Sequence, residues 1–234
     1  MHVLLTGATG YIGRRLLTVL LDQGHTITCC VRSASRFHKP ELGQERIRVI
    51  ETDFSQKMEI IPGTEPVDAA YYLIHSLAGS TSGYESHEKM TATNFRHLAE
   101  ALQCKQVIYL GGIANEEDLS EHLSSRKAVE DILNDGPFST TILRAGIIVG
   151  SGSASFEIIR DLVEKLPVMV APRWVNTRCQ PIAVKNVIQY LTGVLGNPAT
   201  YDQTFDIGGP EILTYKKMML DFGAVRKLRR TIIT

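Results

Sequence analysis

The sequence lacks a metal-binding pattern and any long hydrophobic run. It has only four cysteines, Cys29, Cys30, Cys104 and Cys179, and none stands in the Cys-x-x-Cys or Cys/His spacing that binds zinc. We therefore expect reduced thiols and no metal. No run of about 18 apolar residues occurs, and no charged leader precedes the first apolar run. These absences favour a cytoplasmic protein that does not interact with a membrane.

An excess of charge of one sign is missing as well. The chain has 25 Lys and Arg against 25 Asp and Glu, and its isoelectric point is near 7.1. A balanced surface does not recruit nucleic acid or an anionic membrane, so neither partner is expected. Hydrophobic residues make up 44% of the 234 residues, which is enough for a globular core.

Short apolar runs alternate with amphipathic helical patterns over most of the chain. Strands that are apolar on both faces and alternate with helices predict an α/β fold. The expected architecture is a Rossmann-type doubly wound parallel sheet with helices on both faces. The predicted strands cover residues 2–6, 26–31, 47–51, 68–74, 106–110 and 140–149, and the predicted helices cover 11–24, 85–103 and 119–134.

The pattern changes after Gly150, where extended pieces become short and three further helices follow, at 155–167, 184–196 and 213–225. We predict a doubly wound domain over residues 1–150. Residues 151–234 are expected to form a small C-terminal lobe, with the final helix and strand belonging to the same domain. Because the chain stops within the strand-like run "RRTIIT", we expect it to be truncated before a further C-terminal domain.

The stretch "TGATGYIG" follows the first strand and opens the first helix. Gly7 can take a tight turn, Gly10 lets the backbone approach a pyrophosphate, and Gly13 lets the helix pack closely. The helix N-terminus then offers free N–H groups to the phosphates. A glycine-rich turn without a ligand is the alternative. The predicted dinucleotide loop comprises Gly7, Thr9, Gly10, Tyr11, Ile12 and Gly13.

The residues after the second strand bear on the choice of cofactor. An acidic residue about 20 positions after the glycines would favour NAD, but Arg32 stands there, with Ser33 and Arg36 beside it. Guanidinium groups and a hydroxyl suit a 2′-phosphate, so we predict NADP, with NAD as the alternative if Arg32 only stacks on the adenine. Asp53 is expected to accept from the adenine amino group, with Phe54 as its apolar neighbour.

These motifs, with the glycines after "VIYL" and the loop "LRAGIIVGSG", resemble the atypical short-chain dehydrogenases/reductases, most of all the NmrA-like NAD(P)-binding proteins. Later segments such as "RCQPIAVKNVIQYL" and "FDIGGPEILTYKKMM" resemble a bacterial subgroup that carries an additional C-terminal domain of uncharacterised function. The resemblance covers essentially the whole chain. It implies a Rossmann fold with a smaller substrate lobe.

The resemblance also implies positions for further cofactor residues. The loop after the fourth strand should lie against the ribose and pyrophosphate, and "RAG" at 144–146 should border the nicotinamide. Asn94 falls where these enzymes usually carry an asparagine. The residues implied in this way are Leu73, Ile74, His75, Ser76, Gly111, Ala145 and Gly146.

The Tyr-xxx-Lys pair on which the reductase chemistry of this superfamily normally depends is missing. None of the eight tyrosines is followed by lysine four residues later, and the helix at that place carries His122 and Arg126 instead. The usual serine position is occupied by Gly111 and Gly112. Either His122 donates the proton while Arg126 holds the ribose, or both residues only line the cleft.

Three functions remain open, of which the third is isomerase or lyase chemistry with a tightly held cofactor. The first is an NADP-dependent oxidoreductase acting on an unknown carbonyl or quinone-like small molecule, since hydride chemistry belongs to the cofactor. The second is a non-catalytic, cofactor-sensing regulatory protein of the NmrA-like kind. Long helices in this fold often pair in dimers, so a homodimer is also expected.

Overall fold

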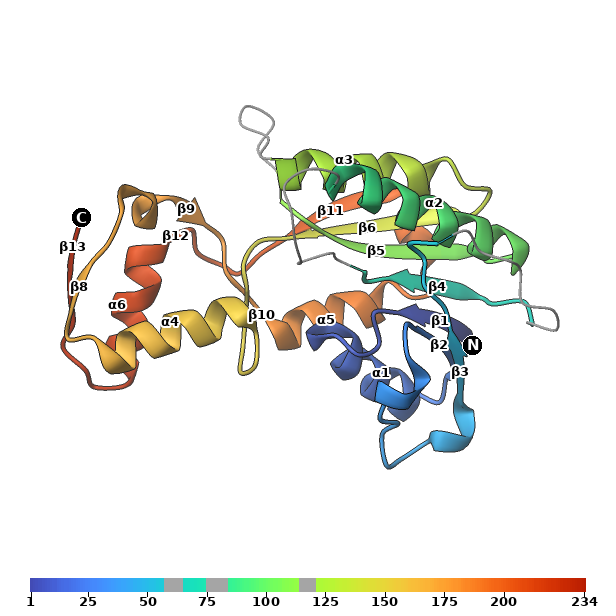
Figure 1. The fold of residues 1–234 in the computed structure, drawn as a ribbon, viewed down its shortest axis with the longest axis horizontal. Helices are drawn as coiled ribbons and strands as arrows, with labels where there is room; N and C mark the ends of the chain where they lie inside the picture. Colours follow the sequence, from blue (N-terminus) through green and yellow to red (C-terminus); the bar gives the residue numbers. More distant parts are fainter. Residues whose placement is uncertain (57–64, 75–83, 114–120) are drawn as a thin grey trace. The chain divides into compact units, whose positions relative to one another are not determined.

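The computed structural model describes residues 1–56, 65–74, 84–113 and 121–234 (Figure 1). The chain divides into two compact units: residues 1–144 with 188–206, and residues 145–187 with 207–234. The first crossing, after Arg144, lies close to the boundary expected at residue 150. The chain then returns once to the first unit before it finishes in the second.

The first unit is built on a seven-stranded sheet in the order β11-β6-β5-β4-β1-β2-β3. The pairs β3–β2, β2–β1, β1–β4 and β4–β5 are parallel. The predicted doubly wound sheet is thus confirmed, with β11 added at one edge. The strands are β1 (His2–Thr6), β2 (Thr26–Val31), β3 (Ile47–Glu51), β4 (Ala69–Tyr72), β5 (Gln106–Gly112), β6 (Ser139–Ala145) and β11 (Gln203–Ile207).

Helices cover both faces of this sheet, as predicted. Figure 1 shows α2 and α3 on one face and α1 on the other. The end of α5 is fastened to the same sheet, because the Tyr71 hydroxyl donates to the Leu191 carbonyl at 2.8 Å. These helices are α1 (Tyr11–Asp22), α2 (Tyr84–Ala101), α3 (Glu121–Asn134) and α5 (Val184–Gly193).

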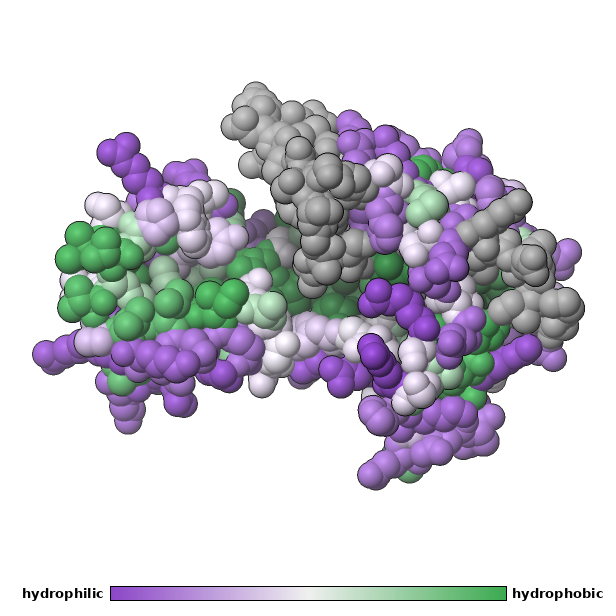
Figure 2. All heavy atoms as spheres, viewed as in Figure 1, coloured by the Kyte–Doolittle hydropathy of each residue, from purple (hydrophilic) through white to green (hydrophobic). Residues whose placement is uncertain are grey.

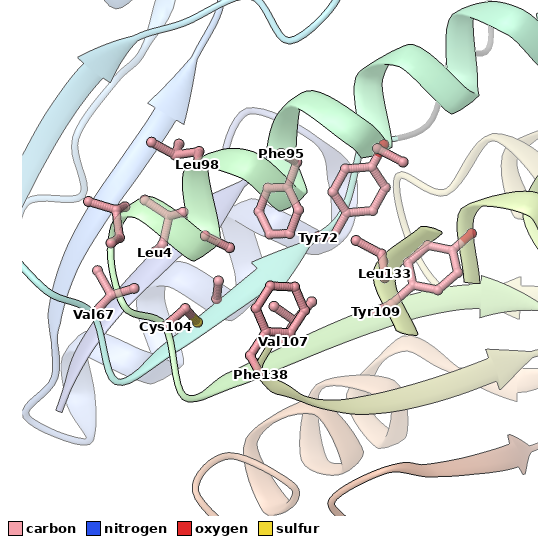
Figure 3. Close-up of a cluster of buried hydrophobic side chains, with 14 of the residues drawn as sticks. Leu4, Val67, Tyr72, Phe95, Leu98, Cys104, Val107, Tyr109, Leu133 and Phe138 are labelled. Carbon is pink, nitrogen blue, oxygen red and sulfur yellow. The ribbon is translucent and has the colours of Figure 1, made fainter. Parts of the chain in front are cut away.

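The core between the sheet and the helix pair α2–α3 is aromatic (Figure 3). Tyr72 of β4 lies with its ring centroid 4.8 Å from that of Phe95 on α2 and 5.7 Å from that of Tyr109 on β5. All three are at most 1% exposed. Tilted aromatic contacts of this kind add to the free energy gained from buried area. This core therefore holds in place the strands whose ends carry the loops of the site.

One buried amide, Gln106, ties residues 188–206 to the sheet. Its Nε2 donates to the Thr141 hydroxyl and to the Val194 carbonyl, both at 2.9 Å. Its Oε1 accepts from the Gly196 N–H at 2.8 Å. All three partners belong to the first unit. The Gln106 side chain therefore helps to hold residues 188–206 against the sheet of that unit.

The second unit packs α4 and α6 with short strands around Met169, Val163 and Met218. β8 pairs with β13 and β7 with β10 in parallel, and β9 pairs with β12 antiparallel. Its elements are β7 (Ile148–Val149), α4 (Ala154–Lys165), β8 (Val168–Val170), β9 (Arg178–Cys179), β10 (Ile182–Ala183), β12 (Leu213–Thr214), α6 (Tyr215–Val225) and β13 (Thr231–Ile233).

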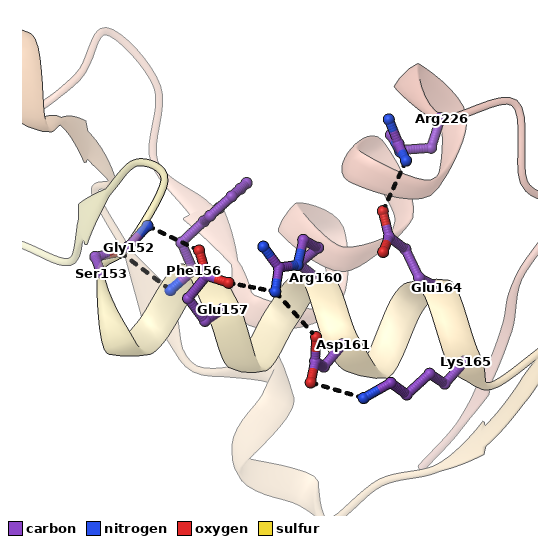
Figure 4. Close-up of polar contacts among 9 residues, drawn as sticks. All are labelled: Gly152, Ser153, Phe156, Glu157, Arg160, Asp161, Glu164, Lys165 and Arg226. Atoms are coloured by element: carbon purple, nitrogen blue, oxygen red, sulfur yellow. Dashed lines mark hydrogen bonds and ion pairs between the residues drawn. The ribbon is translucent and has the colours of Figure 1, made fainter.

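The start of α4 is capped by one serine of the cluster at 151–155. The Ser153 hydroxyl accepts from the Phe156 N–H at 3.2 Å, and Glu157 Oε1 accepts from the Gly152 N–H at 2.7 Å (Figure 4). This reciprocal arrangement satisfies N–H groups at the helix start. Ser153 therefore has a structural role, and Figure 4 also shows the ion pair between Glu164 of α4 and Arg226.

Strand β8 alternates between a buried and an exposed face. Met169 is 5% exposed, whereas Val170 is 86% exposed. Figure 2 shows the hydrophobic side chains of this unit gathering on its surface around α4, β8 and β13. Truncation to alanine should therefore lower the stability of the fold much more at Met169 than at Val170.

We expect Met169→Ala to lower the free energy of unfolding by about 2–4 kcal/mol, since it leaves a cavity in the core of the second unit. Val170→Ala is the matched control and should change it by less than about 0.5 kcal/mol. Urea unfolding followed by the fluorescence of Trp174, the single tryptophan and a member of this unit, measures both. Equal effects at the two positions would contradict the register.

Candidate functional site

The glycine loop after β1 has the geometry that its sequence predicts. Gly7 has a φ of +66°, and a Cβ there would lie 2.6 Å from the Leu73 carbonyl oxygen. The Gly10 N–H donates to the Gly7 carbonyl at 2.8 Å. A Cβ on Gly13 would lie 2.7 Å from the Gly7 carbonyl carbon and closer still to its oxygen. Gly7 and Gly13 must therefore be glycines for α1 to start this close to the loop.

The N-terminus of α1 is open. Gly10 is its N-cap, no side chain caps it, and its first turn contains no acidic residue. Thr9 and Gly10 are exposed, and Tyr11 and Ile12 are partly exposed. The main-chain N–H groups of this turn can therefore donate to an anion, and the helix dipole favours one there. The cradle fits a pyrophosphate.

The loops after β1 and β4 meet where the strand order reverses. β2 lies on one side of β1 and β4 on the other, and ligands of open α/β sheets bind at the carboxyl ends of strands at such a point. The Thr6 hydroxyl donates to the Tyr71 carbonyl at 2.9 Å and accepts from the Leu73 N–H at 3.0 Å. Leu73 is buried and Ile74 partly buried. The other two predicted residues of this loop, His75 and Ser76, lie outside the described residues.

The turn after β2 exposes two cations. Arg32 and Arg36 are exposed, and the Ser33 hydroxyl lies 2.9 Å from the Ser35 hydroxyl. Glu51, at the end of β3, accepts from the Ala34 N–H at 2.8 Å. A carboxylate therefore reaches this turn from the neighbouring strand, although no acidic residue stands in the turn itself.

Asp53 is exposed beside this turn. Its Oδ1 accepts from the Ser55 hydroxyl at 2.7 Å and from the Ser55 N–H at 3.0 Å. The hydroxyl bond is the main cause that holds the pKa of Asp53 below its usual value, and the charge of Arg32 contributes. Both bonds go to Oδ1, which leaves Oδ2 as the atom that could accept an adenine amino group.

The side chain of Phe54 points elsewhere. It is 4% exposed and belongs to the core, with its ring centroid 6.0 Å from that of Phe95. Only its main chain faces the loop. Asn94 holds that main chain, because its Nδ2 donates to the carbonyls of Phe54 and Gln56 at 2.8 and 2.9 Å. The asparagine expected from the family resemblance thus positions the loop that carries Asp53.

The end of β5 brings Gly112 and Arg126 together. A Cβ on Gly112 would fall on Nη1 of Arg126 and lie 3.3 Å from its Cζ, so the guanidinium lies over the glycine backbone. A Cβ on Gly111 would lie 3.4 Å from Glu130 Oε1. Gly111 is buried and Arg126 is partly buried. His122 lies near the start of α3, but its side chain is outside the described part of the structure.

A partly buried ion pair lies beside this guanidinium. Arg144 Nε donates to both oxygens of Glu130, at 3.0 and 3.2 Å, and Arg144 Nη2 lies 2.5 Å from Glu130 Oε2. Glu130 is 5% exposed. Neither this pair nor the role of Glu51 was expected from the sequence. The only sequence signal for Glu130 is its i, i+4 spacing from Arg126.

Ala145 and Gly146 belong to the second unit. Ala145 is 5% exposed, and a Cβ on Gly146 would fall on the Gln180 carbonyl oxygen. Gly146 is therefore fixed by its contact with Gln180 within that unit. A contact of either residue with a nicotinamide stays a prediction.

Within residues 1–56, 65–74, 84–113 and 121–234, no three His, Cys, Asp or Glu side chains gather to hold a metal ion. Over the same ranges no helix has the length and hydropathy needed to cross a membrane. Cys29, Cys30 and Cys104 are buried and Cys179 is partly buried, and all four are free thiols.

A glycine cradle, an uncapped helix start and a strand-order reversal together define a dinucleotide-binding protein of the Rossmann type. A family model described as NAD(P)H-binding matches residues 7–164. Because this match covers more than half of the chain, the protein belongs to the NAD(P)H-binding family.

Two solved structures share the fold over essentially the whole chain. A nucleoside-diphosphate-sugar epimerase from Staphylococcus aureus has a TM-score of 0.80 at 14% identity, over 99% of this chain and 79% of that one. A short-chain dehydrogenase/reductase superfamily protein from Agrobacterium tumefaciens with bound NAD has a TM-score of 0.76 at 12% identity, over 100% and 85%. At these identities the two structures show the shared fold; membership of the atypical short-chain dehydrogenases/reductases, and of their NmrA-like branch, stays a prediction.

Among curated proteins, the chloroplastic divinyl chlorophyllide a 8-vinyl-reductase of Zea mays is 21% identical over 222 residues. The match covers 89% of this chain and 55% of that protein. The chain thus spans about half the length of the plant relatives it matches. The expected further domain and the expected homodimer stay predictions.

Proposed function

We propose that this protein is an NADP-dependent oxidoreductase that reduces a small carbonyl or quinone-like molecule. The observation that carries the proposal is the pair of exposed cations, Arg32 and Arg36, in the turn after β2, where the second phosphate of NADP would lie. The plant relative is named a reductase, which supports reduction over a purely regulatory role. The fold is shared with epimerases, so it does not decide the reaction by itself.

Different residues would bind different parts of the cofactor. The loop from Gly7 to Gly13 would hold the pyrophosphate, Asp53 the adenine, and Arg32 with Ser33 the 2′-phosphate. When bound, the reduced nicotinamide supplies a hydride to the acceptor carbon, and the acceptor oxygen then takes a proton. Arg126 places a fixed positive charge at the end of β5, where it can stabilise negative charge on that oxygen. Arginine does not titrate near neutral pH, so the proton has to come from water or from His122.

Replacing Arg32 by alanine tests the choice of cofactor. We expect the affinity for NADPH to fall by about 10- to 100-fold, the loss for one charge-assisted contact to a phosphate. The affinity for NADH should change by less than about threefold, because NADH has no 2′-phosphate to lose. Calorimetric titration of the wild type and the variant with both cofactors measures this. An equal loss for both would mean that Arg32 stacks on the adenine.

Glu51→Gln provides the opposite control at the same turn. Glu51 accepts from the Ala34 N–H, and its negative charge opposes a phosphate there. The amide keeps an acceptor oxygen but removes the charge, so NADPH should bind more tightly and NADH unchanged. If Glu51→Gln weakens NADPH binding, the phosphate does not lie in this turn.

The second candidate is a non-catalytic sensor of the cofactor. It is favoured by one observation, the absence of a Tyr-xxx-Lys pair from the whole sequence. A sensor would bind NADPH as proposed but would not oxidise it with any member of a panel of aldehydes, ketones and quinones. Turnover with one of them decides for the oxidoreductase.

A further inference from the structure

The guanidinium of Arg126 has no acidic partner within ion-pair distance in the part of the chain that the structure describes. It is partly buried against Gly112. A partly buried charge without a counterion is costly, because it loses hydration and gains no pairing. A ligand that carries a negative charge would offset this loss of hydration.

The acid that would normally neutralise it is Glu130, one helical turn further along α3. Residues at i and i+4 are neighbours on a helix surface, so Arg126 and Glu130 could pair. Glu130 instead gives both oxygens to Arg144 on β6. Arg126, Glu130 and Arg144 together carry a net charge of +1. Because Glu130 pairs with Arg144, the remaining positive charge is that of Arg126.

The direction of the Arg126 side chain also bears on its role. Helical side chains lean toward the N-terminus of their helix, and α3 begins after the loop that leaves the carboxyl end of β5. Arg126 therefore leans toward the strand-end edge, where the ligands of such sheets bind. The two glycines that end β5 leave the space it occupies, since any side chain at residue 112 would collide with Nη1.

We infer that the Arg144–Glu130 ion pair keeps Arg126 un-neutralised, so that Arg126 over Gly112 forms a subsite for a negatively charged oxygen of the substrate. Arg144 and Glu130 are then positioning residues, and Gly112 is the residue that admits the guanidinium. This inference rests on the proposed function, in which a substrate lies at this edge of the sheet. The oxygen belongs either to a carboxylate that the substrate carries or to the oxyanion formed during reduction.

Acetate is the probe for this subsite, and the Nε–H resonance of Arg126 in a nitrogen–proton correlation spectrum is the readout. Arg126→Lys identifies that resonance by its loss. In the wild type, acetate should shift it along a saturable curve. In Arg144→Met, Glu130 is free to turn to Arg126, and the apparent affinity for acetate should fall by about tenfold or more.

The double variant Arg144→Met/Glu130→Gln is the decisive test of this inference. It removes the competing charge, so acetate affinity should return to within about threefold of the wild type. A merely structural role of the ion pair would not be rescued by removing its second member. If both variants fold and the double variant stays weak, or if Arg144→Met binds acetate like the wild type, the inference is overturned.

Gly112→Ser gives a second test that does not touch the ion pair. The atom it would meet is the far end of a flexible side chain, so the fold should tolerate it while Arg126 is displaced and the acetate shift is lost. A retained shift would contradict the subsite. NADPH titration of the same variants separates this outcome from a failure of the proposed function, because the cofactor contacts at Gly7–Gly13 and Arg32 are unchanged.

A substrate assay, once an acceptor is found, distinguishes the two sources of the oxygen. If the substrate carries a carboxylate, Arg126→Lys should raise KM with little change in kcat, since the contact exists before the reaction. If the oxygen becomes charged during reduction, kcat should fall at nearly constant KM. A variant with unchanged KM and unchanged kcat would overturn the inference.

Discussion

Gly13→Ala is expected to lower the free energy of unfolding by about 2–4 kcal/mol and to remove measurable binding of NADPH. The added Cβ would lie 2.7 Å from the Gly7 carbonyl carbon and 3.0 Å from the Ala8 Cα. Both are backbone atoms, so no side chain can move aside. Either α1 shifts away from the sheet or the turn at Gly7 opens, and each change displaces the N–H groups that would bind the pyrophosphate.

Gly24→Ala is the matched control for this substitution. Gly24 has a φ of +87°, and a Cβ there meets no atom within 4 Å. Its cost is therefore backbone strain alone, about 1–2 kcal/mol. Urea unfolding followed by far-ultraviolet circular dichroism gives both stabilities, and calorimetry gives both NADPH affinities. We expect Gly24→Ala to bind NADPH like the wild type. If Gly13→Ala also did so, the loop would not be the pyrophosphate site.

The contrast between these glycines shows what a sequence pattern can predict. The loop at Gly7, Gly10 and Gly13 was predicted because its three roles are local: a turn, a close approach and a helix start within eight residues. Most strands and helices were also predicted, because buried parallel strands and amphipathic helices have distinct periods. The start of α6 is likewise set by local chemistry, since the Thr214 hydroxyl accepts from the Lys217 N–H at 3.1 Å.

The contacts that were missed all join residues far apart in sequence. Glu51 reaches Ala34 because β2 and β3 pair with Val31 opposite Glu51. Glu130 meets Arg144 because α3 packs where β6 ends. Neither register can be read from periodicity, which gives the type of an element but not its neighbours. The side chain of Phe54 was misread for the same reason, since its burial depends on Phe95 of α2.

These missed contacts matter most for the chemistry. The sequence shows that His122 and Arg126 stand where the tyrosine and lysine are expected, but not which groups surround Arg126. The structure puts the Arg126 guanidinium over the backbone of Gly112 and pairs Glu130, one helical turn along α3, with Arg144. A fixed positive charge can stabilise a developing oxyanion without taking part in proton transfer. Loss of the usual tyrosine is therefore compatible with reduction.

Gln106→Leu is expected to lower the free energy of unfolding by about 2–3 kcal/mol, although it replaces a polar side chain by an apolar one of similar size. Gln106 is fully buried, and its amide bonds the Thr141 hydroxyl, the Val194 carbonyl and the Gly196 N–H. Leucine removes all three bonds, at about 1 kcal/mol each, although the Val194 carbonyl still accepts from the Asn197 N–H at 3.2 Å. The exposed Gln203→Leu, also in a strand of this sheet, is the control and should change stability by less than about 0.5 kcal/mol.

The position of the damage distinguishes this explanation from a general loss of packing. If Gln106 holds residues 188–206 on the sheet, the amide of Gly196 should exchange its hydrogen faster in Gln106→Leu, well before global unfolding. Amides of β2 and β3, three and four positions from β5 in the strand order, should keep their protection relative to the new global stability. Uniform loss of protection, or wild-type exchange at Gly196, would mean that this segment is held by its apolar contacts instead. Because Tyr71 also bonds the Leu191 carbonyl, we expect α5 to stay attached while the turn after it opens.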